Sequence, residues 1–219
     1  SGVYFLVWDT TADTAGSDCR FALSSAPTVS GTVLVIGSTV EEIVPSGNVT
    51  RSYTFTLDTH ARLLFDALQA DGDDVAWILE AASGIVDSGN CTGAGADTAR
   101  ILDLRADTYT LRISSSSALD ATLAFRLLDL KAASTLALGD EASGMLVPGS
   151  AVVVGVNVLA GDSFDYVPLT TDQLSGRWML FDPNGAYAAA GDLTTLSNLP
   201  RLTQNGRYTL VWDTDAVAG

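Results

Sequence analysis

Among the residues that could do chemistry in this chain, three carboxylates gather in one short stretch. Asp71, Asp73 and Asp74 lie within four residues, where the sequence predicts a turn. Calcium favours clustered carboxylate oxygens, so these aspartates are the candidate ligands of a calcium ion. They lack the spacing and the closing glutamate of an EF-hand, and a solvated acidic turn is the alternative. Asp140 and Glu141 form a weaker candidate cluster, and no other cofactor is predicted.

Nucleophilic catalysis has few possible carriers in this sequence. His60 is the single histidine, so a serine or cysteine nucleophile would need this side chain as its base. No Gly-x-Ser-x-Gly motif accompanies it, and its position just after an alternating apolar stretch predicts a surface loop. Cys19 and Cys91 are too few for a zinc site or a disulfide framework, and whether they pair is left open. The chain is predicted not to be an enzyme.

Four tryptophans offer a second kind of site. Trp8, Trp77, Trp178 and Trp212 could stack on sugar rings if one sheet face exposed them. They occupy equivalent positions of repeated apolar stretches, which favours packing within the fold. A carbohydrate-binding surface is therefore the alternative and not the main prediction.

Charge and hydropathy argue against two classes of partner. The 219 residues include 26 acidic and 11 basic side chains, which gives a formal net charge of −15. A surface of this sign repels phosphate backbones, so no nucleic-acid partner is expected. Hydrophobic residues make up 47% of the chain, yet no run approaches the roughly 18 apolar residues of a membrane helix. No transmembrane segment is predicted.

Self-comparison reveals an internal repeat, which is the strongest signal in the sequence. The stretch Gly2–Thr10 returns as Gly206–Thr214, with seven of nine residues identical at an offset of 204. A weaker copy, residues 107–114, lies about halfway between these two stretches. The spacing indicates a module of roughly 100 residues whose alternate copies resemble each other most.

Other short motifs recur at the same spacing of about 100 residues. Trp77-Ile78-Leu79 corresponds to Trp178-Met179-Leu180, 101 residues later. Phe21-Ala22-Leu23 corresponds to Phe125-Arg126-Leu127, 104 residues later. Matches in register at nearly one spacing do not arise easily by chance, so they support the repeated module.

Local patterns within the module predict strands. Residues 53–57 and 109–113 alternate large apolar side chains with polar ones, which is typical of half-buried strands. The Asp-Pro-Asn-Gly sequence at 182–185 has strong turn chemistry and predicts a hairpin. Residues 59–70 have apolar positions that suit a helix, but their match to a strand-rich part of the repeat favours a strand. The chain is predicted to be all-β.

The order of these motifs resembles that of the bacterial pre-peptidase C-terminal domain, a small β-sandwich or jelly roll appended to secreted proteases. The resemblance implies two jelly-roll-like β-sandwich modules in tandem, as accessory modules of an exported protein. The matching residues are Gly47, 53–57, 71–74, 77–79, Ser83-Gly84 and 109–113 in one module, and Gly139, 181–185 and 206–211 in the other.

The repeat and the resemblance together predict the domain organisation. Residues 1–28 are the expected tail of a preceding module, 29–132 a complete sandwich, and 133–219 a second sandwich that lacks its last strand. A sheet that lacks a strand exposes an unpaired edge. Residues 18–25 are predicted to fill that gap, either within the chain or by strand exchange with a neighbouring copy.

The predicted function is that of a non-catalytic extracellular repeat module in a large secreted or surface bacterial protein, acting as a spacer or adhesion module. The alternative is a carbohydrate-binding module attached to a secreted enzyme or adhesin. The expected partners are neighbouring repeat modules of the same protein, with glycans or a cell surface as further candidates.

Overall fold

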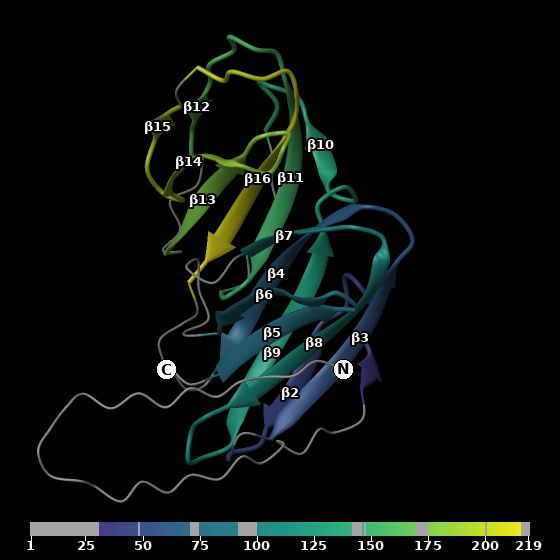
Figure 1. Cartoon of the computed structure of the whole chain (residues 1–219). Coiled ribbons are helices and arrows are strands. Elements are labelled where there is room, and N and C mark those ends of the chain that lie inside the picture. The colour runs from purple at the N-terminus through teal and green to yellow at the C-terminus, as the bar shows by residue number, and fades with distance from the viewer. Residues whose placement is uncertain are drawn as a thin grey trace, which may run out of the picture.

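In the computed structural model of the chain, the described residues are 31–47, 49–70, 75–91, 100–141, 146, 148–169, 175–199 and 201–215. All regular elements in these ranges are strands, as the sequence predicts, and they form two β-sandwiches in succession (Figure 1). The described part of the chain has no helix long and apolar enough to cross a membrane.

The first sandwich consists of a five-stranded and a four-stranded sheet. Sheet A has the spatial order β1 (Thr32–Val33), β3 (Thr50–Leu57), β8 (Asp107–Ser115), β5 (Val75–Ala81) and β6 (Gly84–Asn90). Sheet B has the order β2 (Val40–Val44), β9 (Ala121–Asp129), β4 (Ala61–Ala70) and β7 (Arg100–Leu104).

Aromatic side chains form the centre of the first core. The ring of Phe65 stacks on that of Trp77 with 5.0 Å between centroids, and on that of Phe125 with 5.6 Å. Tyr53 meets Phe125 edge to face at 5.3 Å. The alternation predicted for residues 53–57 and 109–113 is confirmed, because their large apolar side chains point into this core.

The second sandwich has one full sheet and one short one. Sheet C has the order β10 (Ser134–Leu136), β11 (Ala151–Val158), β16 (Gly206–Thr214), β13 (Gly176–Phe181) and β14 (Tyr187–Asp192). The facing sheet D, within the described residues, consists of β12 (Asp165–Tyr166) and β15 (Ser197–Asn198). The core between them includes Trp178, Leu180 and Tyr208.

Sheets A and C match strand for strand. In both sheets the first strand pairs in parallel with the second, and the other pairings are antiparallel. Each tryptophan ring packs on a glycine of the next strand: a Cβ added to Gly89 would lie 2.9 Å from Trp77, and one added to Gly191 would lie 2.9 Å from Trp178. The residues at which each module begins and ends stay a prediction.

Strand β4 explains why residues 59–70 also suited a helix. Leu63 and Phe65 point into the first core, whereas Leu64 and Asp66 point toward the second sandwich, and all four are buried. A strand buried on both faces reads as a continuous apolar run and loses the alternation of a half-exposed strand. The strand preferred by the repeat is confirmed. The hairpin predicted at 182–185 is also confirmed, between β13 and β14.

Candidate functional site: the junction between the sandwiches

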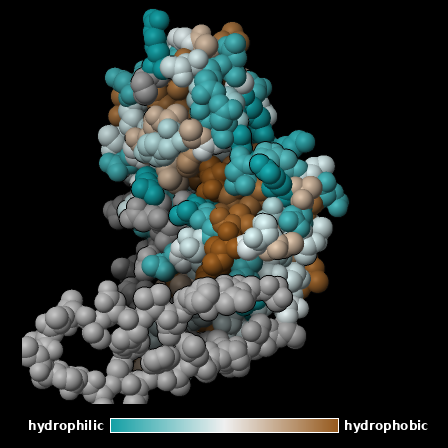
Figure 2. Space-filling model, in the orientation of Figure 1, coloured by the Kyte–Doolittle hydropathy of each residue, from teal (hydrophilic) through white to brown (hydrophobic). Residues whose placement is uncertain are grey.

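The outer face of sheet B packs directly on the outer face of sheet C. Hydrophobic residues gather where the two sandwiches meet on the face that Figure 2 shows. The sheets therefore stack in the order A, B, C, D, with an apolar layer between each neighbouring pair. The junction layer consists of Leu64, Ile101, Leu128, Leu130, Ala151, Val153, Met179, Phe181 and Val211.

A buried ion pair lies within this junction. Arg126 on β9 donates from Nε to Asp66 Oδ2 on β4 at 2.7 Å, and from Nη2 to the carbonyl oxygen of Ala151 at 2.7 Å. The backbone amide of Ala151 donates to the same Asp66 oxygen at 3.3 Å. Asp66 is 2% exposed and Arg126 is 23% exposed. The pair belongs to the first sandwich, yet it binds both backbone groups of a residue at the start of β11.

Burial governs the protonation of this aspartate. It raises the pKa of the Asp66 carboxyl above its ordinary value, because desolvation penalises the charged form. The Arg126 guanidinium and the Ala151 amide act in the opposite direction on that pKa. Opening the junction would leave this ion pair within the first sandwich but break its two hydrogen bonds to the Ala151 backbone, so those two bonds favour the docked arrangement.

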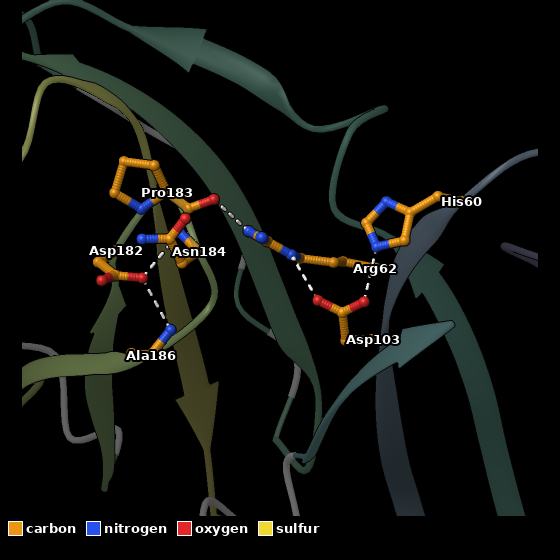
Figure 3. A network of polar contacts seen from close by, with 7 residues as sticks. All are labelled: His60, Arg62, Asp103, Asp182, Pro183, Asn184 and Ala186. Atoms are coloured by element: carbon orange, nitrogen blue, oxygen red, sulfur yellow. Dashed lines mark hydrogen bonds and ion pairs between the residues drawn. The ribbon is translucent and has the colours of Figure 1, made fainter. Parts of the chain in front are cut away.

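A second polar contact crosses the junction at the start of β4 (Figure 3). Arg62 donates from Nη1 to the carbonyl oxygen of Pro183 in the second sandwich at 2.5 Å. Its Nε lies 3.3 Å from Asp103 Oδ2, and His60 Nε2 lies 2.6 Å from Asp103 Oδ1. The hydrogen bond from His60, followed by that from Arg62, lowers the pKa of Asp103. His60 is exposed in a loop, as predicted, and its contact with Asp103 helps to orient Arg62.

The turn that receives Arg62 is itself well ordered by hydrogen bonds. Asp182 accepts through Oδ1 from the backbone amides of Asn184 and Ala186, both at 2.8 Å. Its Oδ2 accepts from Gln204 Nε2 at 2.7 Å. These contacts hold the Pro183 carbonyl in place. The Asp182 carboxylate thus positions the carbonyl oxygen that accepts the hydrogen bond from Arg62 of the first sandwich.

A third arginine stabilises the connection between the sandwiches. Arg207 on β16 donates to the carbonyl oxygens of Leu130, Lys131 and Ala133 at 3.1, 3.3 and 2.6 Å. Its guanidinium lies over Gly155 on β11, where an added Cβ would overlap it. Residues 130–133, here called the connecting segment, are thus bound to the surface of sheet C and do not act as a free linker.

The acidic residues singled out in the sequence do not contribute to this junction. Asp71, Asp73 and Asp74 lie outside the described residues, so their calcium site stays a prediction. Asp140 and Glu141 are exposed, and Asp140 accepts from a backbone amide within its own turn. Within the described ranges, no group of three or more metal-ligating side chains is present.

The tryptophans are structural where the structure describes them. Trp77 and Trp178 are 2% and 1% exposed, and Trp212 is half-buried beside the second core. Trp8 lies outside the described residues. The prediction that these rings pack within the fold is confirmed for Trp77 and Trp178, which therefore offer no stacking surface to a sugar.

Cys91 is a free cysteine within the first core. Burial raises the pKa of its thiol to about 12, so it carries little thiolate at neutral pH. Cys19 lies outside the described residues, and its pairing stays open.

Sequence reasoning missed the three arginines of the junction. Arg62, Arg126 and Arg207 stand at positions of strands where a solvated charge is the ordinary interpretation. A signal was present in the acidic residue Asp66, which interrupts the apolar run of β4 and needs a partner once that run is buried on both faces.

No protein-family model matches the chain, and no curated protein matches it in sequence. The chain is similar to the solved pre-peptidase C-terminal domain of a collagenase from Bacillus anthracis, with 16% identity and a TM-score of 0.39, over 45% of this chain and 94% of that one. It is also similar to PliG of Aeromonas hydrophila, a periplasmic inhibitor of g-type lysozyme, with 10% identity and a TM-score of 0.35, over 47% and 99% of the two chains. Another similar structure is the CUB1-EGF-CUB2 segment of human MASP-1/3, with 9% identity and a TM-score of 0.27, over 83% and 95%. The first of these belongs to the family that the sequence motifs resemble.

Proposed function

We propose that this chain is a non-catalytic module of a secreted or surface bacterial protein, and that it acts as a rigid spacer. The observation that carries this proposal is the bond between the Asp66–Arg126 pair and the backbone of Ala151 across the junction. A spacer must transmit a fixed direction from one module to the next, and these cross-junction hydrogen bonds resist bending because their directional geometry is lost when the two sheets tilt apart.

The other junction contacts support the same function. Arg62 reaches Pro183 at one side of the interface, and Arg207 binds the connecting segment at another. Together with the apolar layer, they restrain the second sandwich at separate points, which opposes hinge motion. The strongly negative charge suits a soluble extracellular surface. No described contact favours adhesion or glycan binding over the spacer, and both stay alternatives.

The distribution of distances between spin labels on the two sandwiches tests this function. Ile85→Cys and Leu196→Cys place labels at side chains that are 67% and 57% exposed. A Cys19→Ser background leaves Cys91, which is buried, as the only native thiol. Dilution with unlabelled chain restricts the measurement to distances within one molecule. We expect a single narrow distribution.

Matched arginine substitutions identify the cause of that rigidity. Arg126→Met leaves Asp66 buried without its cation, so we expect the distribution to broaden and the free energy of unfolding to fall by about 3 kcal/mol. Arg112→Met is the control, because Arg112 and Glu80 form a partly exposed pair within sheet A, at 2.9 Å. A broad distribution in the unaltered chain would contradict the spacer. A narrow one in Arg126→Met would show that this bond does not carry it.

A further inference from the structure

Sheets A and C each have one short edge strand and one long edge strand. The short edges are β1, with two residues, and β10, with three. The long edges are β6, with seven residues, and β14, with six. A long edge strand presents unpaired backbone N–H and C=O groups to strands of other chains, and charged side chains that point inward are one means of blocking such pairing. The two long edges differ in this protection.

An ion pair blocks the long edge of sheet A. Asp87 on β6 lies opposite Leu79, which is buried in the first core, so the Asp87 carboxylate points toward the facing sheet. There Arg100 on β7 donates to its two oxygens, from Nε at 2.7 Å and from Nη2 at 2.6 Å. A strand added at β6 would bring this pair into the interior of a wider sandwich, where desolvation penalises charge.

The corresponding position on β14 carries no charge. Ala189 lies opposite Leu180, as Asp87 lies opposite Leu79. The single charged residue of the strand is Asp192, at its end. Both long edges have a bulge in the pairing with their neighbour, so the bulge does not distinguish them. Among the described residues, sheet C thus ends in a long edge without the inward charge that blocks sheet A.

The hydrogen-bond pattern shows which backbone groups β14 offers to a further strand. Just after β14, the N–H of Leu193 donates to the carbonyl oxygen of Gly176 at 3.2 Å. Hydrogen-bonded pairs alternate along an antiparallel ladder, so the register directs the backbone groups of Gly191 toward β13 and those of Ala190 and Asp192 away from it. Ala190 and Asp192 are both exposed. Their N–H and C=O groups are therefore available to an antiparallel strand.

We propose that β14 pairs antiparallel with β14 of a second copy and joins the two C sheets into one continuous sheet. A two-fold axis places Ala190 opposite Ala190 of the second copy, and Asp192 opposite Ala188. No like charges face each other across this pair, and the side chains near the axis are small enough not to collide. The contact is isologous, so the assembly closes at two copies. The pairing goes beyond the spacer function and does not depend on it.

The charge of the chain determines how the dimer should respond to salt. Each copy has a formal net charge of −15, so electrostatic repulsion opposes the association of two copies. The Debye length falls from about 8 Å at physiological ionic strength to about 3 Å at 1 M, so added salt screens this repulsion. We expect the dissociation constant of the dimer to fall as the salt concentration rises. A dimer that dissociates in added salt would be held by ion pairs and would contradict the proposed pairing.

Molar mass in solution tests the assembly. Light scattering over a range of protein and salt concentrations should give masses that rise toward twice the 22.8 kDa of one chain. Ala190→Pro should stay at the mass of one chain, because proline has no N–H to donate across the axis. Ser88→Pro is the matched control on β6 and should still dimerise, since Ser88 pairs with Ile78 as Ala190 pairs with Met179. A single-chain mass for the unaltered protein throughout, or dimers of Ala190→Pro, would overturn the proposal.

Charged substitutions at the axis keep the test independent of folding defects. Ala190→Asp and Ala190→Lys should each give the mass of one chain at physiological ionic strength, because two like charges then face each other. An equimolar mixture of the two variants should recover the dimer, since opposite charges now meet. Near-ultraviolet circular dichroism of each variant should match that of the unaltered protein, because position 190 is exposed. A mixture that does not associate would overturn the pairing about Ala190.

A cross-link then tests the register. Ala190→Cys in a Cys19→Ser background should give a covalent dimer on oxidation, because residues of a hydrogen-bonded antiparallel pair have Cα atoms about 5.5 Å apart. Cys91 is buried and does not compete. Asp192→Cys is the control, since the register separates the two copies of this position by about 13 Å along the strand. Cross-linking of Asp192→Cys, or none by Ala190→Cys, would overturn the register.

Discussion

Sheets A and C agree in strand order, pairing and bulge position, whereas the sheets that face them do not agree. Sheet B has four strands of five to ten residues, and sheet D has, among the described residues, two strands of two residues each. Sheet A has one hairpin, β5 with β6, and antiparallel pairings of β8 with β5 and β3. Sheet C follows the same plan, with the hairpin of β13 and β14 and the pairings of β16 with β13 and β11. Within the described residues, the two facing sheets therefore differ far more than the two five-stranded sheets do.

The largest expected effect separates the two facing sheets directly. Phe65→Ala removes a fully buried ring between Trp77 and Phe125, so we expect the free energy of unfolding to fall by about 3–5 kcal/mol. Tyr166 stacks on Trp178 at 5.2 Å, as Phe65 stacks on Trp77 at 5.0 Å, but its ring is only half-buried. Tyr166→Ala should therefore cost about 1–2 kcal/mol. Urea unfolding at low protein concentration measures both. Equal losses would mean that the two facing sheets are equally well packed.

A smaller effect tests the likeness of sheets A and C. An alanine at Gly89 or Gly191 places a methyl group against the neighbouring tryptophan ring, at 2.9 Å in each case. Overpacking of this kind costs about 1–3 kcal/mol, and we expect nearly the same loss of unfolding free energy for both substitutions. Ser88→Ala, at an exposed position of the same strand as Gly89, should stay within about 0.5 kcal/mol of the unaltered protein. A large difference between the losses of unfolding free energy in the two glycine variants would contradict the likeness of sheets A and C.

The smallest effect concerns pH and belongs to the first sandwich alone. The folded-state pKa of Asp66 is raised by burial above 3.8, so the folded protein retains this proton to higher pH than the unfolded chain. The free energy of unfolding therefore falls as pH rises from 3.8 through the raised value. Asp66→Asn should remove this fall, as followed by urea unfolding at a series of pH values.

Asp103 provides the control of opposite sign. The hydrogen bond from His60 lowers its pKa, so its contribution to stability is present above the ordinary aspartate pKa and is lost as pH falls through the lowered value. Asp103→Asn should remove that loss and leave the Asp66 effect unchanged. An Asp66→Asn variant with the full pH dependence of the unaltered protein would contradict the assignment.

Much of the five-stranded sheets could be predicted from the sequence, because their rules are local. Residues 53–57 alternate since one face is buried, and the Asp-Pro-Asn-Gly turn defines the hairpin of β13 and β14 without distant help. Strand β4 was harder, because burial on both faces erases the alternation that distinguishes a strand from a helix.

The junction could not be predicted from the sequence, for a different reason. Arg62 and Arg126 bind carbonyl oxygens of residues 121 and 25 positions away. Every residue carries a carbonyl group, so no residue type marks the acceptor. Asp66 in its apolar run indicated that a partner was needed, but only the packing of the two sandwiches shows which one. The calcium prediction at Asp71, Asp73 and Asp74 remains a prediction.

The manner in which Arg207 binds the connecting segment bears on how such a protein can change over evolutionary time. Its three acceptors at Leu130, Lys131 and Ala133 are main-chain oxygens. Substitutions at the exposed Lys131 therefore leave the acceptor in place, whereas Gly155 has little freedom beneath the guanidinium. Homologous chains should accumulate variation in the connecting segment without altering the angle between sandwiches, provided that the arginine and the glycine are inherited together.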